Sequence, residues 1–226
     1  MTAATTLDLD LVSDFVCPWC FIGKTRLERA LADLQAVRPD IEVHVRWWPF
    51  LLNPDTPPEG EPYRAFLEAK FGGPRKVDEI LARIADAARP DGLAFAFERI
   101  RTRPNTFNAH RLCHRAQTSG QTPAQLRALA GALFAAHFQE GRDVGDSQTL
   151  ADIAAACGDD RDAVLDYLNS PRDVAEVAAL VREVGRQGIG GVPFFVIDRR
   201  LAVSGAQPAA VLVEALLQAA SPERPA

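Results

Sequence analysis

The first 50 residues carry two strand patterns on either side of a helical one, and this order restricts the fold more than any other feature of the chain. Apolar and polar residues alternate over residues 7–13 and again over 41–47, the two-residue period of a strand with one buried face. Between them, from Cys17 to Pro39, apolar residues recur at helical spacing. This order predicts two parallel strands joined by a right-handed crossover.

The rest of the chain divides into a loop, a helical region and a hairpin. Five prolines between Pro49 and Pro62 mark the loop. Residues 63–187 read as five to seven helices, with 93–101 assigned to neither helix nor strand. Residues 193–197 and 201–204 predict a hairpin, followed by a last helix after Pro208. We therefore expect an α/β domain of order βαβ…ββα, built from residues 1–62 and 188–226, with residues 63–187 as a large all-helical insertion.

Composition excludes several classes of protein and of partner. In a chain of 226 residues, 47% hydrophobic and 24% charged content excludes a disordered or collagenous protein. The net charge of −5, without a long basic stretch, argues against nucleic acid. The longest nearly apolar run, residues 128–136, is far shorter than the roughly 20 residues that cross a bilayer. The first 16 residues contain three aspartates and no basic residue, so we expect no secretory signal and a cytoplasmic location.

The motif Cys17-Pro18-Trp19-Cys20 follows the first strand and opens the helix. Unpaired N–H groups and the helix dipole favour an anion at that point, so Cys17 is expected to be a nucleophile. One turn later, Cys20 is placed to attack a mixed disulfide at Cys17 and release the partner. Two alternatives are a plain buried pair and half of a zinc site. The zinc site would have to draw further ligands from His110, Cys113 and His114. A Cys-x-x-Cys pair beside a βαβ unit favours redox chemistry, with no metal.

The phrases DFVCPWCFIG, PNTFNAHRL and GVPFFVIDRRLAVSGAQP, in this order, resemble the DsbA family of thioredoxin-fold proteins, in particular its FrnE-like cytoplasmic branch. The resemblance covers nearly the whole chain and implies a thioredoxin-like fold. It also implies a cis peptide bond before Pro193, with Val192 and Pro193 lying against Cys17, and substrate contacts at Pro18, Trp19 and Val192. The alternative for Pro193 is a trans proline that merely starts a strand.

The sequence departs from this family at two points. Thioredoxin relatives often hold a buried acid six residues before the first cysteine, where this chain has Leu11. Asp14 is a possible substitute as general base for Cys20, although a solvated aspartate at the strand end is the favoured interpretation. The pair between the cysteines also lacks the histidine that DsbA uses to stabilise its thiolate, so the resemblance does not imply strong oxidising power.

Outside the motif, His110 and His114 are expected to be ordinary surface or capping residues. Cys113 is expected to pack in the core of its helix, and Cys157 at a helix end.

These features predict a cytoplasmic thiol–disulfide oxidoreductase or isomerase that exchanges protein or small-molecule disulfides and requires no cofactor, with glutathione as a possible partner. One alternative is a glutathione-dependent isomerase or transferase, since 2-hydroxychromene-2-carboxylate isomerases and kappa-class glutathione transferases resemble this arrangement. Those relatives typically carry serine where this chain has Cys17. Another alternative is a non-catalytic zinc or interaction module.

Overall fold

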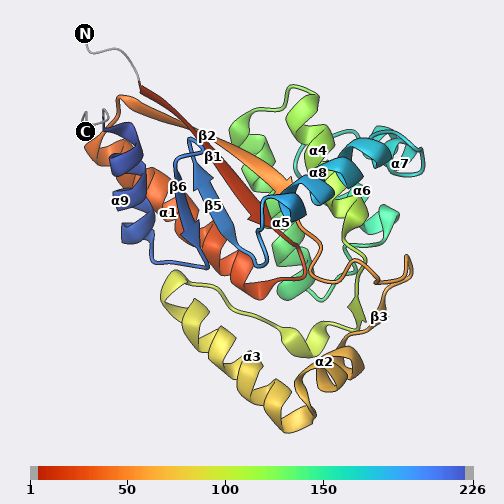
Figure 1. Cartoon of the computed structure of the whole chain (residues 1–226). Helices are drawn as coiled ribbons and strands as arrows, with labels where there is room; N and C mark the ends of the chain where they lie inside the picture. Colours follow the sequence, from red (N-terminus) through yellow and green to blue (C-terminus); the bar gives the residue numbers. More distant parts are fainter. Residues whose placement is uncertain (1–4, 222–226) are drawn as a thin grey trace.

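A computed structural model of the chain describes residues 5–221 and contains a four-stranded central sheet (Figure 1). Strand β1 (Thr5–Ser13) pairs in parallel with β2 (Ile41–Pro49), and helix α1 (Pro18–Val37) connects them. Strand β5 (Phe194–Ile197) runs antiparallel to β1, and β6 (Leu201–Ser204) completes the hairpin. The order β2-β1-β5-β6 confirms the predicted βαβ and hairpin units.

Strand β1 lies in the middle of the sheet, and helices cover both of its faces. Leu7, Leu9 and Leu11 point into the main core, which α1 and the last helix, α9 (Ala209–Ala220), help to form side by side (Figure 1). Val12 points to the other face, where it packs with Val184 of helix α8 (Val174–Arg186). The alternation that predicted the strand thus separates two layers of helices.

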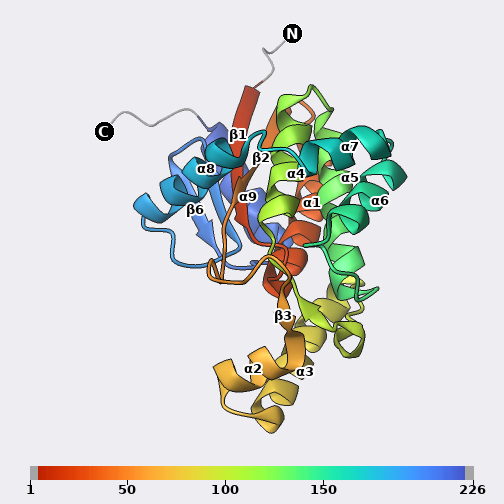
Figure 2. The same ribbon diagram turned by 90° about the vertical axis from the view of Figure 1, so that its right-hand side faces the viewer.

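The region between β2 and β5 contains seven α-helices among the described residues, the upper limit of the prediction. Besides α8, they are α2 (Tyr63–Phe71), α3 (Pro74–Ala88), α4 (Phe107–Thr118), α5 (Pro123–Phe138), α6 (Ser147–Ala156) and α7 (Arg161–Leu168). In Figure 2, α2 and α3 project from one end of the molecule. Residues 93–101, left unassigned, are irregular apart from one turn of 3₁₀ helix at Phe97–Arg99. Within residues 5–221, no helix has the length and apolar content to span a membrane.

A second, two-stranded sheet was not predicted. Strand β3 (Glu61–Pro62) pairs antiparallel with β4 (Thr102–Arg103). Each strand has only two residues, too few to show any periodicity in the sequence. This ladder lies at the start of α2 and brings Arg103 next to Phe66 of that helix.

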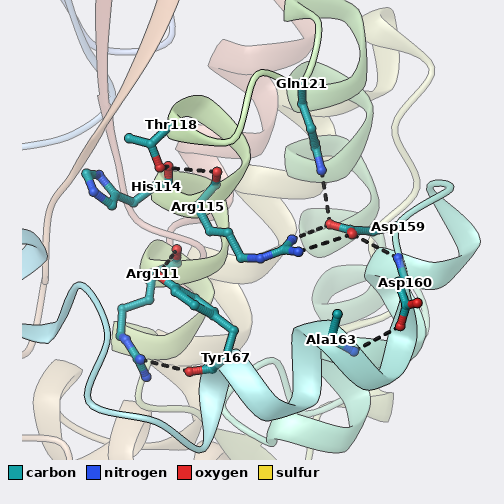
Figure 3. Close-up of polar contacts among 9 residues, drawn as sticks. All are labelled: Arg111, His114, Arg115, Thr118, Gln121, Asp159, Asp160, Ala163 and Tyr167. Atoms are coloured by element: carbon teal, nitrogen blue, oxygen red, sulfur yellow. Dashed lines mark hydrogen bonds and ion pairs between the residues drawn. The ribbon is translucent and has the colours of Figure 1, made fainter.

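Buried polar contacts fix α4 against its neighbours (Figure 3). The guanidinium of Arg111, 2% exposed, donates to the carbonyl oxygens of Leu168, Tyr167, Ser170 and Arg172. The hydroxyl of Tyr167 lies 3.0 Å from the carbonyl oxygen of Arg111 and donates back to it. One side chain thus satisfies four carbonyl groups at the end of α7 and in the loop after it. The position of α4 matters because its N-terminal end lies at the site described next.

Candidate active site

Cys17 is the residue at which α1 begins. Its backbone is extended, with φ −98° and ψ 110°, and Pro18 occupies the first helical turn. No acidic side chain lies in that turn to oppose an anion. The thiol is 5% exposed and donates to the carbonyl oxygen of Val192, with an Sγ–O distance of 3.7 Å. The sulfur therefore lies between the positive end of a helix and a loop from the far end of the chain.

Cys20 lies one turn further into α1 and is fully buried. Burial raises the pKa of its thiol well above the usual value, and the hydrogen bond and charge of Cys17 raise it further. The neighbouring Asp14 backbone and Ser13 side chain oppose that shift. Both cysteines are free thiols. The two sulfurs are thus in contact but unequal, and Cys20 is held as the protonated partner. Ser13, 1% exposed, carried no signal in the sequence.

Aromatic residues on both sides of the motif anchor it to α5. Before the motif, the ring centroid of Phe15 lies 5.0 Å from that of Phe134. After it, Phe21 stacks on the same Phe134 ring, with the centroids 5.4 Å apart. These rings are almost fully buried. Aromatic packing of this kind holds the loop before Cys17 and the first turns of α1 in one position.

The loop before β5 lies against α1, as the family resemblance implies. The Val192–Pro193 peptide bond is cis. A Cβ atom added to Gly23 would lie 2.8 Å from Cγ of Pro193, so the proline ring touches the helix where a glycine leaves room. Gly23 was missed in the sequence, although a glycine inside a helix costs about 1 kcal/mol and usually has a packing reason.

The residues expected to contact substrate surround one cavity. A cavity of about 490 Å³ lies between the start of α1 and the α2–α3 pair. Cys17, Pro18, Trp19 and Val192 all line it, and Trp19 is 40% exposed. Its volume is in the range of small-molecule sites.

The expectation that Asp14 is solvated is wrong. Its side chain is 1% exposed, because the loop after β2 and the start of α4 cover the end of β1. Its carboxylate accepts hydrogen bonds from the Leu52 backbone N–H at 2.8 Å and from the Thr106 hydroxyl at 2.7 Å. A buried carboxylate with several donors is satisfied in place. Asp14 therefore ties three segments together directly behind the motif.

The expectation for His110 is also wrong, since this side chain is 6% exposed. Its Nε2 lies 3.1 Å from the carbonyl oxygen of Phe50 and 3.6 Å from Oδ1 of Asp14. Both errors have one cause: the sequence does not show that the loop at Phe50 folds over the end of β1. His114, on the same helix, is half-buried and away from these contacts.

A second buried histidine, His137 of α5, was not singled out in the sequence. It is completely buried, with Nδ1 3.4 Å from the carbonyl oxygen of Arg142 and its ring edge-on to Tyr63. Burial lowers its pKa to about 4, opposed by the Arg142 carbonyl and the charge of Asp14. Its Nε2 has no hydrogen-bond partner within the described part of the chain.

The remaining two cysteines lie where the sequence predicts. Cys113 is 3% exposed in the core, where burial raises its pKa, and Cys157 is half-buried at the end of α6. No three His, Cys, Asp or Glu side chains of residues 5–221 are grouped so as to hold a metal ion.

Comparison with known proteins gives matches over nearly the whole chain. The profile of the DSBA-like thioredoxin domain family matches residues 8–217. The solved structure of a probable DsbA oxidoreductase from Streptomyces coelicolor is 34% identical, with a TM-score of 0.83 over 97% of this chain and 92% of its own.

Two further solved structures share the fold at lower identity. Cytosolic disulfide reductase DsbM from Pseudomonas aeruginosa, solved with GSH, is 19% identical, with a TM-score of 0.60 over 93% of this chain and 99% of its own. A 2-hydroxychromene-2-carboxylate isomerase is 18% identical, with a TM-score of 0.66 over 93% of this chain and 95% of its own. At these identities the likeness concerns the fold alone.

Proposed function

We propose, from the premise that this chain belongs to the DSBA-like thioredoxin domain family, that it is a thiol–disulfide oxidoreductase working through Cys17 and Cys20. The observation that carries the proposal is the inequality of the two thiols. Cys17 borders the cavity at the start of α1, whereas Cys20 is enclosed and its pKa is raised. The Cys17 sulfur can therefore react with a substrate in the cavity, and the buried Cys20 sulfur can react afterwards with the mixed disulfide.

The exchange proceeds in two displacements. The Cys17 thiolate attacks one sulfur of a substrate disulfide, a mixed disulfide forms, and the other substrate sulfur leaves as a thiolate with the electron pair of the broken bond. Cys20 then gives up its proton and attacks the Cys17 sulfur, which releases the second substrate thiolate. The substrate gains two electrons, and the cysteine pair becomes a disulfide. The reverse sequence would oxidise a dithiol.

Residues around the pair have separate roles in this proposal. The Val192 backbone, whose carbonyl faces Cys17 at 3.7 Å, would pair with an extended substrate. Pro193 carries no N–H and presents an apolar ring beside α1. Pro18 and Trp19, which follow Cys17 in the chain, also line the cavity. Asp14 is the base candidate for the Cys20 proton, since its carboxylate is buried behind the motif; its backbone contacts that thiol only as a hydrogen-bond donor.

The proposal needs no metal or organic cofactor, and it places the protein in the cytoplasm, where thiol pools keep such a pair reduced. A low-molecular-weight thiol such as glutathione would regenerate the dithiol. The shared fold with DsbM, solved with GSH and named a cytosolic reductase, supports this choice. Protein disulfides and small disulfides are both candidate substrates.

The test is reduction of insulin disulfides by the chain in the presence of glutathione. We expect Cys17→Ser to abolish activity. In a single turnover without glutathione, prereduced Cys20→Ala should accumulate a mixed disulfide at Cys17, visible by mass spectrometry. Cys157→Ser is the matched control and should retain activity, because this residue caps the end of α6 and does not line the cavity. A glutathione-dependent isomerase, the alternative drawn from the fold, would not use Cys20. Release of both substrate thiols by prereduced Cys20→Ala without glutathione, and without a trapped intermediate, would therefore contradict the proposal.

A further inference from the structure

The cavity beside Cys17 is lined by apolar and cationic side chains. Most of its lining is apolar and comes from α2 and α3, including Phe66, Leu67 and Ile80. Three cationic side chains also reach it, Lys70, Arg83 and Arg103. No aspartate or glutamate is among the described residues that line it. An apolar cavity edged by positive charge alone is complementary to an apolar group that carries an anion.

Lys70 is an exposed cation to which no described carboxylate is paired. Its Nζ lies 5.4 Å from the ring centroid of Phe66 and 5.9 Å from that of Phe71, and it donates to Oδ1 of Asn53 at 3.1 Å. Within residues 5–221 it forms no ion pair with a carboxylate. The Lys70 ammonium group therefore lies over aromatic rings of the cavity wall and can bind a ligand anion.

Arg83 on α3 is likewise exposed and forms no ion pair among the residues that the structure describes. Glu79, four residues before Arg83 on α3, forms no ion pair with it within residues 5–221. Two other acids of the α2–α3 pair, Glu68 and Asp78, are engaged by Arg64, which lies 2.7 Å from Asp78. These two carboxylates therefore do not neutralise Lys70 or Arg83.

Arg103 adds a third charge to the cavity wall. It is 3% exposed, and its guanidinium stacks 3.9 Å from the ring centroid of Phe66. Its Nη2 donates to the Thr56 hydroxyl at 2.6 Å, and Nη1 lies 3.3 Å from Oε2 of Glu61 without making a hydrogen bond. Glu61 offsets part of this charge, so the two exposed cations are the ones to test.

We infer that the cavity selects small aromatic or otherwise apolar disulfides that carry a carboxylate, with the apolar part between α2 and α3 and the anion at Lys70 and Arg83. This inference rests on the proposed function, since the disulfide must react at Cys17. The bond changes are those of the two displacements above: the substrate disulfide is cleaved to two anionic thiols, and the Cys17–Cys20 disulfide forms. In a single turnover the prereduced protein supplies both electrons, so no other reductant is needed.

The kinetic test mixes the reduced chain with four disulfides and follows the released thiol. They are dithiobis-nitrobenzoate (aromatic and anionic), dithiodipyridine (aromatic and neutral), hydroxyethyl disulfide (aliphatic and neutral) and cystamine (cationic). Each rate constant is divided by that of dithiothreitol with the same disulfide, which removes differences in leaving group. We expect the highest ratio for the aromatic carboxylate.

The matched variants separate the cavity charges from net charge. Lys70→Met with Arg83→Met should lower the ratio for dithiobis-nitrobenzoate by about 2- to 10-fold, since each exposed charge pair is a modest interaction. Added salt should have the same effect. The ratio for dithiodipyridine should stay unchanged. Arg75→Met with Lys76→Met removes two charges from α3 outside the cavity and should leave both ratios unchanged.

A binding measurement distinguishes failure of this inference from failure of the proposed function. In Cys17→Ser no exchange can occur, yet calorimetry should still detect binding of naphthoate, which the double variant at Lys70 and Arg83 weakens, and none of naphthylmethylamine. Binding of naphthoate without exchange in the wild type would overturn the proposed function while the cavity assignment stands. Equal ratios for the four disulfides would overturn the inference. So would a double variant that behaves like its control, or a faster normalised reaction with an unfolded protein disulfide.

Discussion

Acid should destabilise this protein through His137, which α5 buries completely. Burial holds the pKa of this ring at about 4, whereas a free histidine titrates at about 6.5. Between these values the unfolded chain binds a proton that the folded chain does not. The free energy of unfolding therefore falls as the pH is lowered. The full contribution of the neutral ring is present above about pH 6.5, and it is lost between there and about pH 4.

The magnitude follows from the two pKa values. A difference of about 2.5 corresponds to about 3 kcal/mol, and about 2.4 kcal/mol of this is lost between about pH 7 and about pH 4.5. The groups that face the ring are the Arg142 carbonyl and the Asp14 carboxylate, both of which favour protonation, and Tyr63, whose phenol stays neutral over this range. None of them reverses the sign.

The assay is urea unfolding, followed by circular dichroism, of the wild type and two variants at both pH values. His137→Asn keeps a donor for the Arg142 carbonyl, and His137→Phe replaces the ring with an apolar one, so neither titrates at this position. Both variants should lose about 2 to 3 kcal/mol less stability than the wild type on acidification, because other titrating groups cancel in the comparison. Equal losses would refute the reasoning, as would an NMR titration of wild-type His137 with a midpoint near 6.5.

Three further outcomes are expected. Under mild oxidant, the chain should form one intramolecular disulfide, Cys17–Cys20, with the other two cysteines still alkylatable after unfolding; peptide mass mapping showing either of them bonded to Cys17 would contradict the site. Gly23→Ala should push the Pro193 loop away from α1. This should lower the free energy of unfolding by about 1–3 kcal/mol and slow disulfide exchange. Wild-type kinetics in this variant would show that the contact is dispensable. Asp14→Asn should lose about 1–3 kcal/mol, because an amide accepts fewer hydrogen bonds than the carboxylate; urea unfolding at neutral pH measures this, and an unchanged midpoint would speak against the contacts described.

The elements that could be predicted are those whose information is local. In β1 and β2, apolar and polar residues alternate along the sequence. The Cys-Pro-Trp-Cys motif lies directly after a strand pattern and at the start of a helical one. The parallel pairing follows from the crossover rule, and the contact of Val192 with Cys17 follows from the family resemblance.

The features that could not be predicted depend on which segments meet. From the sequence, Asp14 is an acid at the end of a strand. Only the structure shows that the Leu52 backbone N–H and the Thr106 hydroxyl donate hydrogen bonds to its carboxylate. The same loop buries His110. The β3–β4 ladder is too short for a pattern. Gly23 gave the one usable clue, since a glycine in the middle of a helix beside the motif calls for a close neighbour.

The contact between Cys17 and Val192 also has a consequence for how the protein is made. The two residues are 175 positions apart in the chain, and β1 lies between β2 and β5, so its second edge stays unpaired until β5 has been synthesised. During translation the cysteine motif and its helix emerge first, while the carbonyl and proline that face them emerge only near the end. Contacts this distant in sequence form late and slowly. A nascent chain that stops before residue 191 would present the reactive cysteine without the loop that shields it, open to adventitious disulfides with other unfinished chains.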